Sequence, residues 1–479
     1  MGGRKRFAVA TAHPDRHWVL DRVAYRLDAE VDAIPARKED ILGLIGRAYH
    51  AESLDVSEVA DQLASASSVT GEIQLTEDVL ELDDKAPAVQ LVHAMLLQAV
   101  KQRASDIHVE PGEDGVRVRF RIDGVLYDRA KLRPEVREGV ASRIKVMGRM
   151  DIAERRLPQD GGVPIRIGDR RIDLRIATLP GQYGERIVMR LLDKSTGLLS
   201  LDGLGLSPKG LGDIKKLLDL AHGIVLVTGP TGCGKTTTLY AMLSAMNSAE
   251  LNILTLEDPV EYQLPGISQT QVSEKKGLTF ARGLRALVRQ DPDIIMVGEI
   301  RDLETASVAI QSALTGHLVL STLHTNDAPA SIARLLDLGV EPYLVASSVN
   351  AAIAQRLVRH VCPKCRELVD VDWPQARISG WSEDDLGFLR TFGVAKAARS
   401  KGCESCLKTG FAGRTAIYEI LIVSDQTRDM VARRAAAGEI RKAALGAGML
   451  SLRRDGLLKV AQGVTTLDEV RDVTQMDIE

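Results

Sequence analysis

Residues 224–236 read Ile-Val-Leu-Val-Thr-Gly-Pro-Thr-Gly-Cys-Gly-Lys-Thr, and this stretch decides the fold. Its last eight residues fit the pattern G-x-x-x-x-G-K-[ST], in which glycines let a loop wrap a phosphate with backbone N–H groups. A buried-strand run precedes the loop, and residues 237–246 can form a helix whose N-terminus adds positive field at the phosphate. A chance glycine-rich turn would not need this strand–loop–helix context, so we interpret the stretch as a nucleotide-binding loop.

The residues of this loop have separate expected roles. Lys235 would reach the β- and γ-phosphates, and the hydroxyl of Thr236 would ligate Mg²⁺, so ATP with Mg²⁺ is the expected cofactor. Cys233 occupies a variable position of the pattern and is interpreted as a small filler, not as a nucleophile. The expected nucleotide-binding residues are Gly229, Pro230, Thr231, Gly232, Cys233, Gly234, Lys235, Thr236 and Thr237.

Outside the loop, short apolar runs alternate with helical patterns from about residue 201 onwards. The runs that predict strands of a parallel sheet, and hence an α/β fold, are 224–227, 253–256, 294–297 and 318–320. Polar residues follow the last three runs in turn: Glu257, Asp258 and Glu261, then Glu299, then His324. Ligands bind beyond the carboxyl ends of such strands, so we expect these side chains to converge on the loop. Each carboxylate taken alone is better explained as a solvated loop residue or a helix cap.

The preceding part of the chain predicts an α+β domain over residues 84–198. Apolar residues between 89 and 100 predict a helix, and the segments 116–127 and 165–176 alternate apolar and charged residues as hairpins do. Residues 1–78 are interpreted as a small helical domain with short amphipathic helices around 41–45 and 56–63, and the acidic stretch 76–85 is interpreted as a linker.

Composition limits the classes of protein. The chain has 479 residues and a mass of 52.0 kDa, too large for one core, and 45% hydrophobic residues argue against general disorder. A net charge of −3 offers no general attraction to nucleic acid. The basic start precedes too short an apolar run for a secretory signal, and no stretch is apolar and long enough for a membrane span. We therefore expect a cytoplasmic protein whose membrane contact is peripheral.

Four of the five cysteines form two Cys-x-x-Cys pairs. Cys362 and Cys365 are separated from Cys403 and Cys406 by 37 residues. Two such pairs fit a closed, structural Zn²⁺ site with four thiolates, in a subdomain over residues 360–410. Two other interpretations stay open: two redox dithiols, or a zinc ribbon that binds nucleic acid.

Four sequence boxes together resemble the secretion-ATPase superfamily of type II and type IV pilus-like systems. They are the loop itself, the "Asp box" Thr-Leu-Glu-Asp-Pro-Val-Glu at 255–261, the Walker B motif Asp-Ile-Ile-Met-Val-Gly-Glu-Ile-Arg-Asp at 293–302, and the "His box" Gly-His-Leu-Val-Leu-Ser-Thr-Leu-His-Thr at 316–325. The similarity extends from about residue 88 to 479. Residues 277–286 and 453–456 favour the type II secretion ATPases, with the extension-type pilus assembly ATPases as the close alternative.

The resemblance implies roles for the acidic residues and the histidine. Glu299 would polarise water or hold Mg²⁺ indirectly, and Glu261 would share that work. Glu257 and Asp258 would support them. His324 would sense or position the γ-phosphate.

The resemblance also implies roles for arginines, because positive charge must stabilise the phosphoryl group in transfer. Arg175 and Arg190 of the second domain would face the γ-phosphate, whereas Arg285 and Arg289 would reach a neighbouring site. Solvation at the surface is the alternative for each of them. His108 lies in another family box at 105–111. Its role would be that of a metal ligand or, more simply, that of a structural residue.

The architecture and setting follow from the same resemblance. It implies a RecA-like P-loop core over residues 199–479, a PAS-like second domain, and an ATP-hydrolysing motor that assembles as a homo-oligomer, a hexamer. The motor would power protein export through a type II secretion system at the cytoplasmic face of the bacterial inner membrane, docking to platform proteins through residues 1–78, without nucleic acid. Two other classes stay open: a nucleic-acid translocase with a RecA-like core, and a nucleotide-gated scaffold without turnover.

Overall fold

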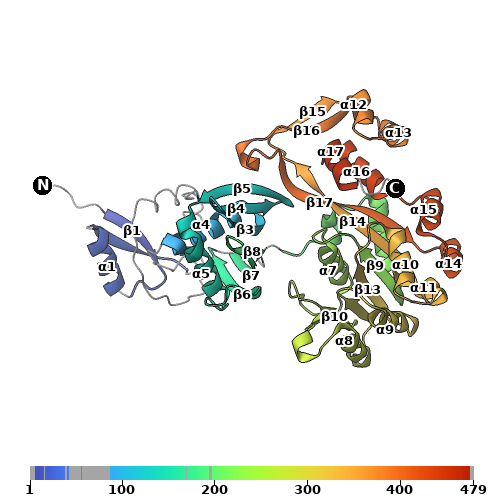
Figure 1. Ribbon diagram of the computed structural model, residues 1–479, viewed down its shortest axis with the longest axis horizontal. Helices are drawn as coiled ribbons and strands as arrows, with labels where there is room; N and C mark the ends of the chain where they lie inside the picture. The colour runs from blue at the N-terminus through green and yellow to red at the C-terminus, as the bar shows by residue number, and fades with distance from the viewer. Residues whose placement is uncertain are drawn as a thin grey trace. The chain divides into compact units, whose positions relative to one another are not determined.

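The chain divides into two compact units, Met1–Gly197 and Leu198–Glu479 (Figure 1). The structure is a computed structural model. It describes residues 6–15, 17–27, 29–37, 40–41, 56, 87–168, 170–193 and 197–474.

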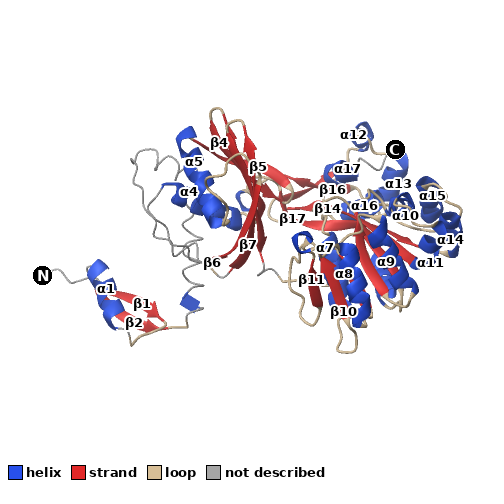
Figure 2. Cartoon of the chain, turned by 60° about the horizontal axis from the view of Figure 1, so that its bottom comes forward, coloured by secondary structure: helices blue, strands red, loops and turns tan. Residues whose placement is uncertain are grey.

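The first described segment is a small strand–helix–strand element. Strands β1 (Arg6–Thr11) and β2 (Glu30–Pro35) pair in parallel and are joined through helix α1 (His17–Leu27), as Figure 2 shows. The helical expectation for residues 1–78 did not include these strands. The run Phe-Ala-Val-Ala-Thr before Pro14 is too short for a helix and suits a strand. The expected helices around 41–45 and 56–63 and the linker at 76–85 lie almost wholly outside the described residues.

Residues 87–193 of the first unit, as far as they are described, form a six-stranded antiparallel sheet with two helices on one face. The strand order is β5-β4-β3-β8-β7-β6, and helices α4 and α5 pack their apolar side chains against the sheet. The predicted helix and both hairpins are present. The elements are α4 (Pro87–Lys101), β3 (Ala104–Gly112), β4 (Gly115–Ile122), β5 (Val125–Leu132), α5 (Arg137–Met147), β6 (Gln159–Ile167), β7 (Arg170–Gly181) and β8 (Gly184–Asp193).

Alternation along these strands separates an apolar face from a charged one. On β4, Val118 and Phe120 are buried in the core, whereas Arg119 and Arg121 lie on the opposite face. The same alternation on β7 and β8 places arginines on the face away from α4 and α5. The hairpin turn at Asp123 and Gly124 has positive φ angles of 48° and 89°, as a tight turn between twisted strands requires.

The second unit is built on a seven-stranded sheet of order β11-β10-β12-β13-β9-β14-β17. All neighbours are parallel except β17, which runs antiparallel to β14. The four predicted strands are confirmed as β9, β10, β12 and β13. The strands are β9 (Gly223–Thr228), β10 (Ile253–Glu257), β11 (Ser268–Gln271), β12 (Ile294–Val297), β13 (Leu318–Leu323), β14 (Val349–Val361) and β17 (Phe411–Ile422).

Helices cover both faces of this sheet, which explains why its strands are apolar without alternation. Val225 and Val227 pack in one core with α6 and α7, and Ile224 and Leu226 in the other core with the remaining helices. The helices are α6 (Pro208–Leu218), α7 (Lys235–Met246), α8 (Phe280–Leu287), α9 (Leu303–Leu314), α10 (Ala328–Asp337), α11 (Pro342–Ser348), α14 (Asp425–Ala432), α15 (Ala437–Gly446), α16 (Leu452–Ala461) and α17 (Leu467–Thr474).

An insertion between β14 and β17 carries the cysteines. It contains the antiparallel strands β15 (Arg366–Asp370) and β16 (Lys396–Ser400) and the helices α12 (Trp373–Ile378) and α13 (Glu383–Thr391). The buried Arg453 of α16 fixes this insertion to the unit. Its guanidinium lies 4.3 Å from the centre of the Trp381 ring, and its Nε lies 2.9 Å from Asp385.

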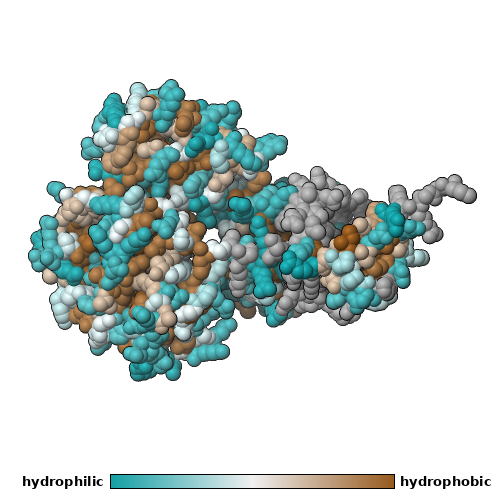
Figure 3. Space-filling view, turned by 180° about the vertical axis from the view of Figure 1, so that it is seen from behind, coloured by the Kyte–Doolittle hydropathy of each residue, from teal (hydrophilic) through white to brown (hydrophobic). Residues whose placement is uncertain are grey.

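The surface of the second unit mixes apolar and polar residues on the face that Figure 3 shows. Among the described residues, no helix is long and apolar enough to cross a membrane.

Candidate functional site

The carboxyl ends of four neighbouring parallel strands meet at one edge of the large sheet. β13 lies between β12 and β9, and β10 lies on the other side of β12. Hydrogen bonds join these ends: Gly298 N donates to Leu256 O at 2.7 Å, and Thr325 N donates to Thr228 Oγ1 at 2.8 Å. The residues that follow the four strands are therefore held at a common edge, where the sequence pattern placed them.

The phosphate loop leaves β9 at this edge and ends where α7 begins. Gly229, Gly232 and Gly234 have φ angles of 147°, 79° and 90°, a region that favours glycine. A Cβ atom at Gly229 would meet the carbonyl oxygen of Gln355 at 2.5 Å, so no other residue fits there without a shift. The first backbone N–H groups of α7 remain for an anion, as at other helix N-termini.

The side chains of the loop differ in exposure. The exposed ones belong to Pro230, Thr231, Thr236 and Thr237, whereas Cys233 is only 4% exposed. Burial raises the pKa of the Cys233 thiol. Its position agrees with a filler and allows contact with a ligand only through the backbone.

Lys235 is the cation of this loop. Its Nζ donates to the carbonyl oxygens of Gly229 at 2.7 Å and Pro230 at 3.1 Å. Burial lowers the pKa of Lys235 by penalising its charged form, while the negative charge of Glu299 acts in the opposite direction. The interaction with Glu299 links the loop electrostatically to the end of β12.

Glu299 is held by two basic side chains. Its side chain is only 15% exposed; Arg301 forms an ion pair with one carboxylate oxygen, and Nε2 of His324 lies 3.2 Å from the other. The hydrogen bond that Arg301 donates to Glu299 raises the pKa of Arg301. The structure thus brings together two residues expected from different boxes. Arg301 was not expected, although its place two residues beyond Glu299 was the signal that could have indicated it.

Glu257 occupies a buried hydrogen-bond network instead of an open position. Tyr240 of α7 donates to one of its oxygens, and Thr255 Oγ1 and Gln269 Nε2 donate to the other at 2.5 Å and 3.0 Å. Burial, followed by the hydrogen bond to Glu257, raises the pKa of Tyr240. Glu257 therefore anchors α7 to β10, and its support of catalysis stays a prediction.

The other two acidic residues of the Asp box lie after β10. Asp258 is exposed, and Glu261 is partly buried, with its backbone N donating to Tyr240 Oη at 3.3 Å. The same tyrosine thus contacts both Glu257 and the segment that carries Glu261. The direct roles of Asp258 and Glu261 stay predictions.

A residue of β14 completes the wall of the loop. Gln355, which is 1% exposed, donates its Nε2 to Cys233 O at 2.6 Å and accepts a hydrogen bond from Thr238 Oγ1 at 2.8 Å. Sequence reasoning missed it, because Gln355 is 122 residues away from Cys233 and belongs to no nucleotide-binding pattern.

The expected arginines form two groups on different units. Arg175 on β7 lies directly opposite Arg190 on β8, on the charged face of the first unit's sheet. In the second unit, Arg285 NH1 donates to Glu304 at 2.7 Å and Arg289 NH1 donates to the carbonyl oxygen of Arg285 at 2.7 Å. Arg190, Arg285 and Arg289 are exposed.

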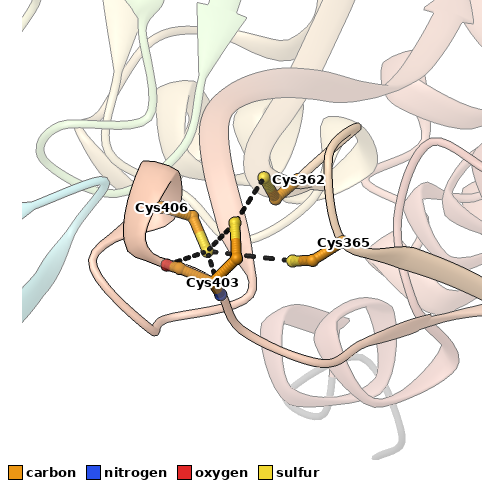
Figure 4. Close-up of side chains that lie close together, drawn as sticks. All are labelled: Cys362, Cys365, Cys403 and Cys406. Atoms are coloured by element: carbon orange, nitrogen blue, oxygen red, sulfur yellow. Dashed lines mark hydrogen bonds between the residues drawn. The ribbon is translucent and has the colours of Figure 1, made fainter.

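The four cysteines of the insertion point toward one another (Figure 4). Their sulfur atoms all lie within 4.8 Å of each other, and the separations include 4.0 Å for Cys362–Cys403, 3.8 Å for Cys365–Cys406 and 3.7 Å for Cys403–Cys406. A tetrahedral ion with metal–sulfur bonds of ~2.3 Å requires sulfur separations of about 3.8 Å. The cluster therefore fits one four-coordinate metal ion.

The sheet order, the phosphate loop and the polar residues at the strand ends define a RecA-like P-loop ATPase. The family model described as Type II/IV secretion system protein matches residues 81–472, so the chain belongs to this family of secretion ATPases and is an ATP hydrolase. The Type II secretion system ATPase E of Vibrio cholerae is 46% identical over 89% of this chain and 84% of its own length.

Two further comparisons extend this placement. The Type IV pilus assembly ATPase PilB of Myxococcus xanthus is 43% identical over 98% of this chain and 82% of its own length. The X-ray structure of the Legionella pneumophila ATPase DotB matches with a TM-score of 0.57 and 21% identity, and the match covers 80% of this chain and 94% of DotB. That structure shares the fold.

Proposed function

We propose that the chain hydrolyses ATP with Mg²⁺ to drive protein export as the motor of a type II secretion system. The observation that carries the proposal is Glu299, a half-buried carboxylate held by His324 and Arg301 at the edge where the phosphate loop begins. The similarity to a type II secretion ATPase over most of the chain supports the same conclusion.

Each residue of the site has a task in this reaction. The loop amides and Lys235 bind the phosphates, and Glu299 orients the attacking water. Bound Mg²⁺ would neutralise charge that develops on the phosphates, and the hydroxyl of Thr236, with Glu299 acting indirectly, would hold it. His324 lies 3.2 Å from one oxygen of Glu299, and we propose that it responds to the γ-phosphate.

The arginines complete the site in an assembly. Arg285 and Arg289 are exposed on the second unit, as residues that serve a neighbouring copy must be. Arg175 and Arg190 supply charge from the first unit. A head-to-tail contact between copies closes into a ring when the rotation permits, and we propose a hexamer.

The four cysteines hold a structural Zn²⁺ ion in this proposal. Thiolate donors in tetrahedral arrangement suit zinc, and four protein ligands leave no open position for catalysis. The ion would stabilise the fold of the insertion.

The setting of the motor is the cytoplasmic face of the bacterial inner membrane. We propose that the chain reaches the membrane through platform proteins to which its first residues dock. The net charge of −3 gives no reason to include nucleic acid among its partners.

Mixing two inactive variants tests the ring. Lys235→Ala should abolish turnover by removing the loop cation, and Arg285→Ala should lower it on the order of 10³-fold if the arginine acts across subunits. A mixture of the two should regain activity, because some sites then combine an intact loop with an intact arginine. Activity per chain that is independent of dilution, without rescue on mixing, would contradict the ring.

Pilus assembly is the second candidate function, favoured by the 43% identity to PilB. Deletion of the gene separates the two. Loss of protein export with normal pili supports the secretion motor, whereas loss of pili with normal export supports the alternative.

A further inference from the structure

Strand β14 extends past the end of β9 and borders the phosphate loop. Ala354 pairs with Thr228, the last residue of β9, and the next two residues of β14 continue alongside Gly229. Successive side chains of a strand point to opposite faces, so Gln355 and Arg356 diverge. Gln355 contacts the start of α7, and Arg356 contacts the segment after His324.

Arg356 touches both loops of the site. It is 7% exposed, its NH2 donates to Asn326 O at 3.0 Å, and its NH1 donates to Gln355 O at 3.4 Å. A Cβ atom built on Gly229 would lie 3.4 Å from the same NH1. One planar guanidinium therefore lies beside Gly229, the first residue of the phosphate loop, and is hydrogen-bonded to the segment two residues after His324.

The charge of Arg356 has no carboxylate partner among the ion pairs of the described residues. Two other arginines of the same unit do: the buried Arg453 lies 2.9 Å from Asp385, and the partly buried Arg441 pairs with Asp327 and Glu419. A buried cation without a counter-charge is unfavourable unless an anion lies near it. In the proposed function, the phosphates of the nucleotide that the adjacent loop binds would supply this anion.

We propose that Arg356 is a positioning residue for ATP hydrolysis, which ties the loop that carries His324 to strand β14, beside the phosphate loop, and places a fixed positive charge next to that loop. Arg356 acts through its neighbours, since its guanidinium is occupied by two backbone carbonyls. Burial lowers the pKa of Lys235, and the charge of Arg356 contributes in the same direction. Lys235 therefore experiences a second cation at the loop.

A conservative substitution separates the effect of the hydrogen bonds of Arg356 from the effect of its charge. Arg356→Lys keeps the charge but cannot reach both carbonyls, so kcat should fall by about tenfold or more while the KM for ATP changes less than about threefold. Arg356→Gln removes the charge as well and should also raise KM. Arg359→Lys is the matched control on the same strand, because Arg359 is neutralised by Glu469 and should affect stability without changing kcat.

A double-mutant cycle tests whether Arg356 acts through the His324 loop. The cycle rests on the proposed role of His324 in hydrolysis. The single variant His324→Ala tests that role separately, and an unchanged kcat of this variant would refute the role of His324 without refuting the role of Arg356. If the proposal is right, Arg356→Lys lowers kcat in the parent protein and has little further effect in the His324→Ala variant. A wild-type kcat for Arg356→Lys, or an equal loss in both backgrounds, would overturn the tie.

A second substitution covers the case in which Arg356 variants do not fold, as judged by thermal unfolding. Thr228→Val removes an independent hydrogen bond that holds Thr325 of the same loop. The expected result is again a lower kcat with little change in KM, and an unchanged kcat would show that the position of this loop does not limit turnover.

Discussion

Arg190 donates its Nε to Asp106 at 2.9 Å, across the pair of strands β3 and β8. Asp106 is 5% exposed, whereas Arg190 is exposed. The buried carboxylate of Asp106 therefore holds the Nε atom of Arg190, whereas the rest of the Arg190 guanidinium remains accessible to solvent. Arg175 lies opposite Arg190 on the next strand, so the orientation of one affects the space available to the other.

This contact gives the first prediction. If Arg190 stabilises the transferred phosphoryl group as proposed, Asp106→Asn should weaken the charge-assisted hydrogen bond to Arg190 and lower kcat by about three- to tenfold, because the arginine is then less ordered. Steady-state ATPase assays measure the effect. Asp114→Asn is the control, since Asp114 is an exposed carboxylate 3.8 Å from Lys131 at the end of the same sheet. Equal activities of both variants would contradict a positioning role for Asp106.

The second prediction concerns Glu299. Glu299→Gln keeps the shape of the side chain but removes the charge that interacts with Arg301, His324 and Lys235. We expect ATP to bind with little change in Kd, while kcat drops by roughly 10² or more because water is no longer polarised. Equilibrium binding of a fluorescent ATP analogue and phosphate release measure the two quantities. Loss of binding would instead assign Glu299 to the nucleotide-binding step.

The third prediction is a pH dependence of stability that originates at His108. Burial lowers the pKa of His108 below its ordinary 6.5, with Arg121 acting in the same direction and Asp106 and Glu110 opposing it. The unfolded chain therefore binds more protons just below pH 6.5 than the folded chain does. The stability that the neutral ring provides is complete above about pH 6.5 and is lost as the pH falls toward the lowered pKa.

The variant His108→Gln checks this sign. Between pH 7.5 and pH 5.5, the wild type should lose more thermal stability than His108→Gln, as measured by unfolding temperature. His222→Gln serves as the control, because His222 is exposed. An identical pH dependence of wild type and His108→Gln would show that another group titrates.

The fourth prediction concerns the metal. Elemental analysis should find about one zinc per chain, and Cys403→Ser should remove it. The unfolding temperature should fall on the order of 5 °C or more, because metal binding contributes folding free energy, with a smaller effect on ATP affinity. Cys233→Ser should retain the zinc, since Cys233 lies outside the cluster. Metal-free wild type with reactive cysteines would remove the site.

Sequence patterns predicted the parts of the site whose residues are close together in the sequence or follow a strand. The phosphate loop is contiguous, and His324 and Glu299 each follow an apolar strand directly, so strand order alone brings them to one edge. The clustering of the four cysteines was predicted because the Cys-x-x-Cys spacing is typical of metal ligands, whatever the surrounding fold.

Those patterns could not predict contacts that the ends of long side chains make with residues distant in the sequence. Arg356 contacts Asn326, which is 30 residues away in the sequence, and Glu257 lies in a buried hydrogen-bond network with Tyr240 and Gln269. Such contacts depend on the register of β14 beside β9 and of β11 beside β10, which sequence periodicity does not specify. For the same reason, the prediction of a helical domain over residues 1–78 did not include the pairing of β1 with β2.

The attachment of the cysteine insertion determines how force would enter the second unit. Arg453 holds the insertion through Trp381 and Asp385, and two residues later Asp455 accepts a hydrogen bond from Tyr418 N of β17 at 2.9 Å. The insertion therefore cannot swing as an independent flap. A force applied to the insertion would therefore be transmitted through these contacts to α16 and to β17 at the edge of the central sheet.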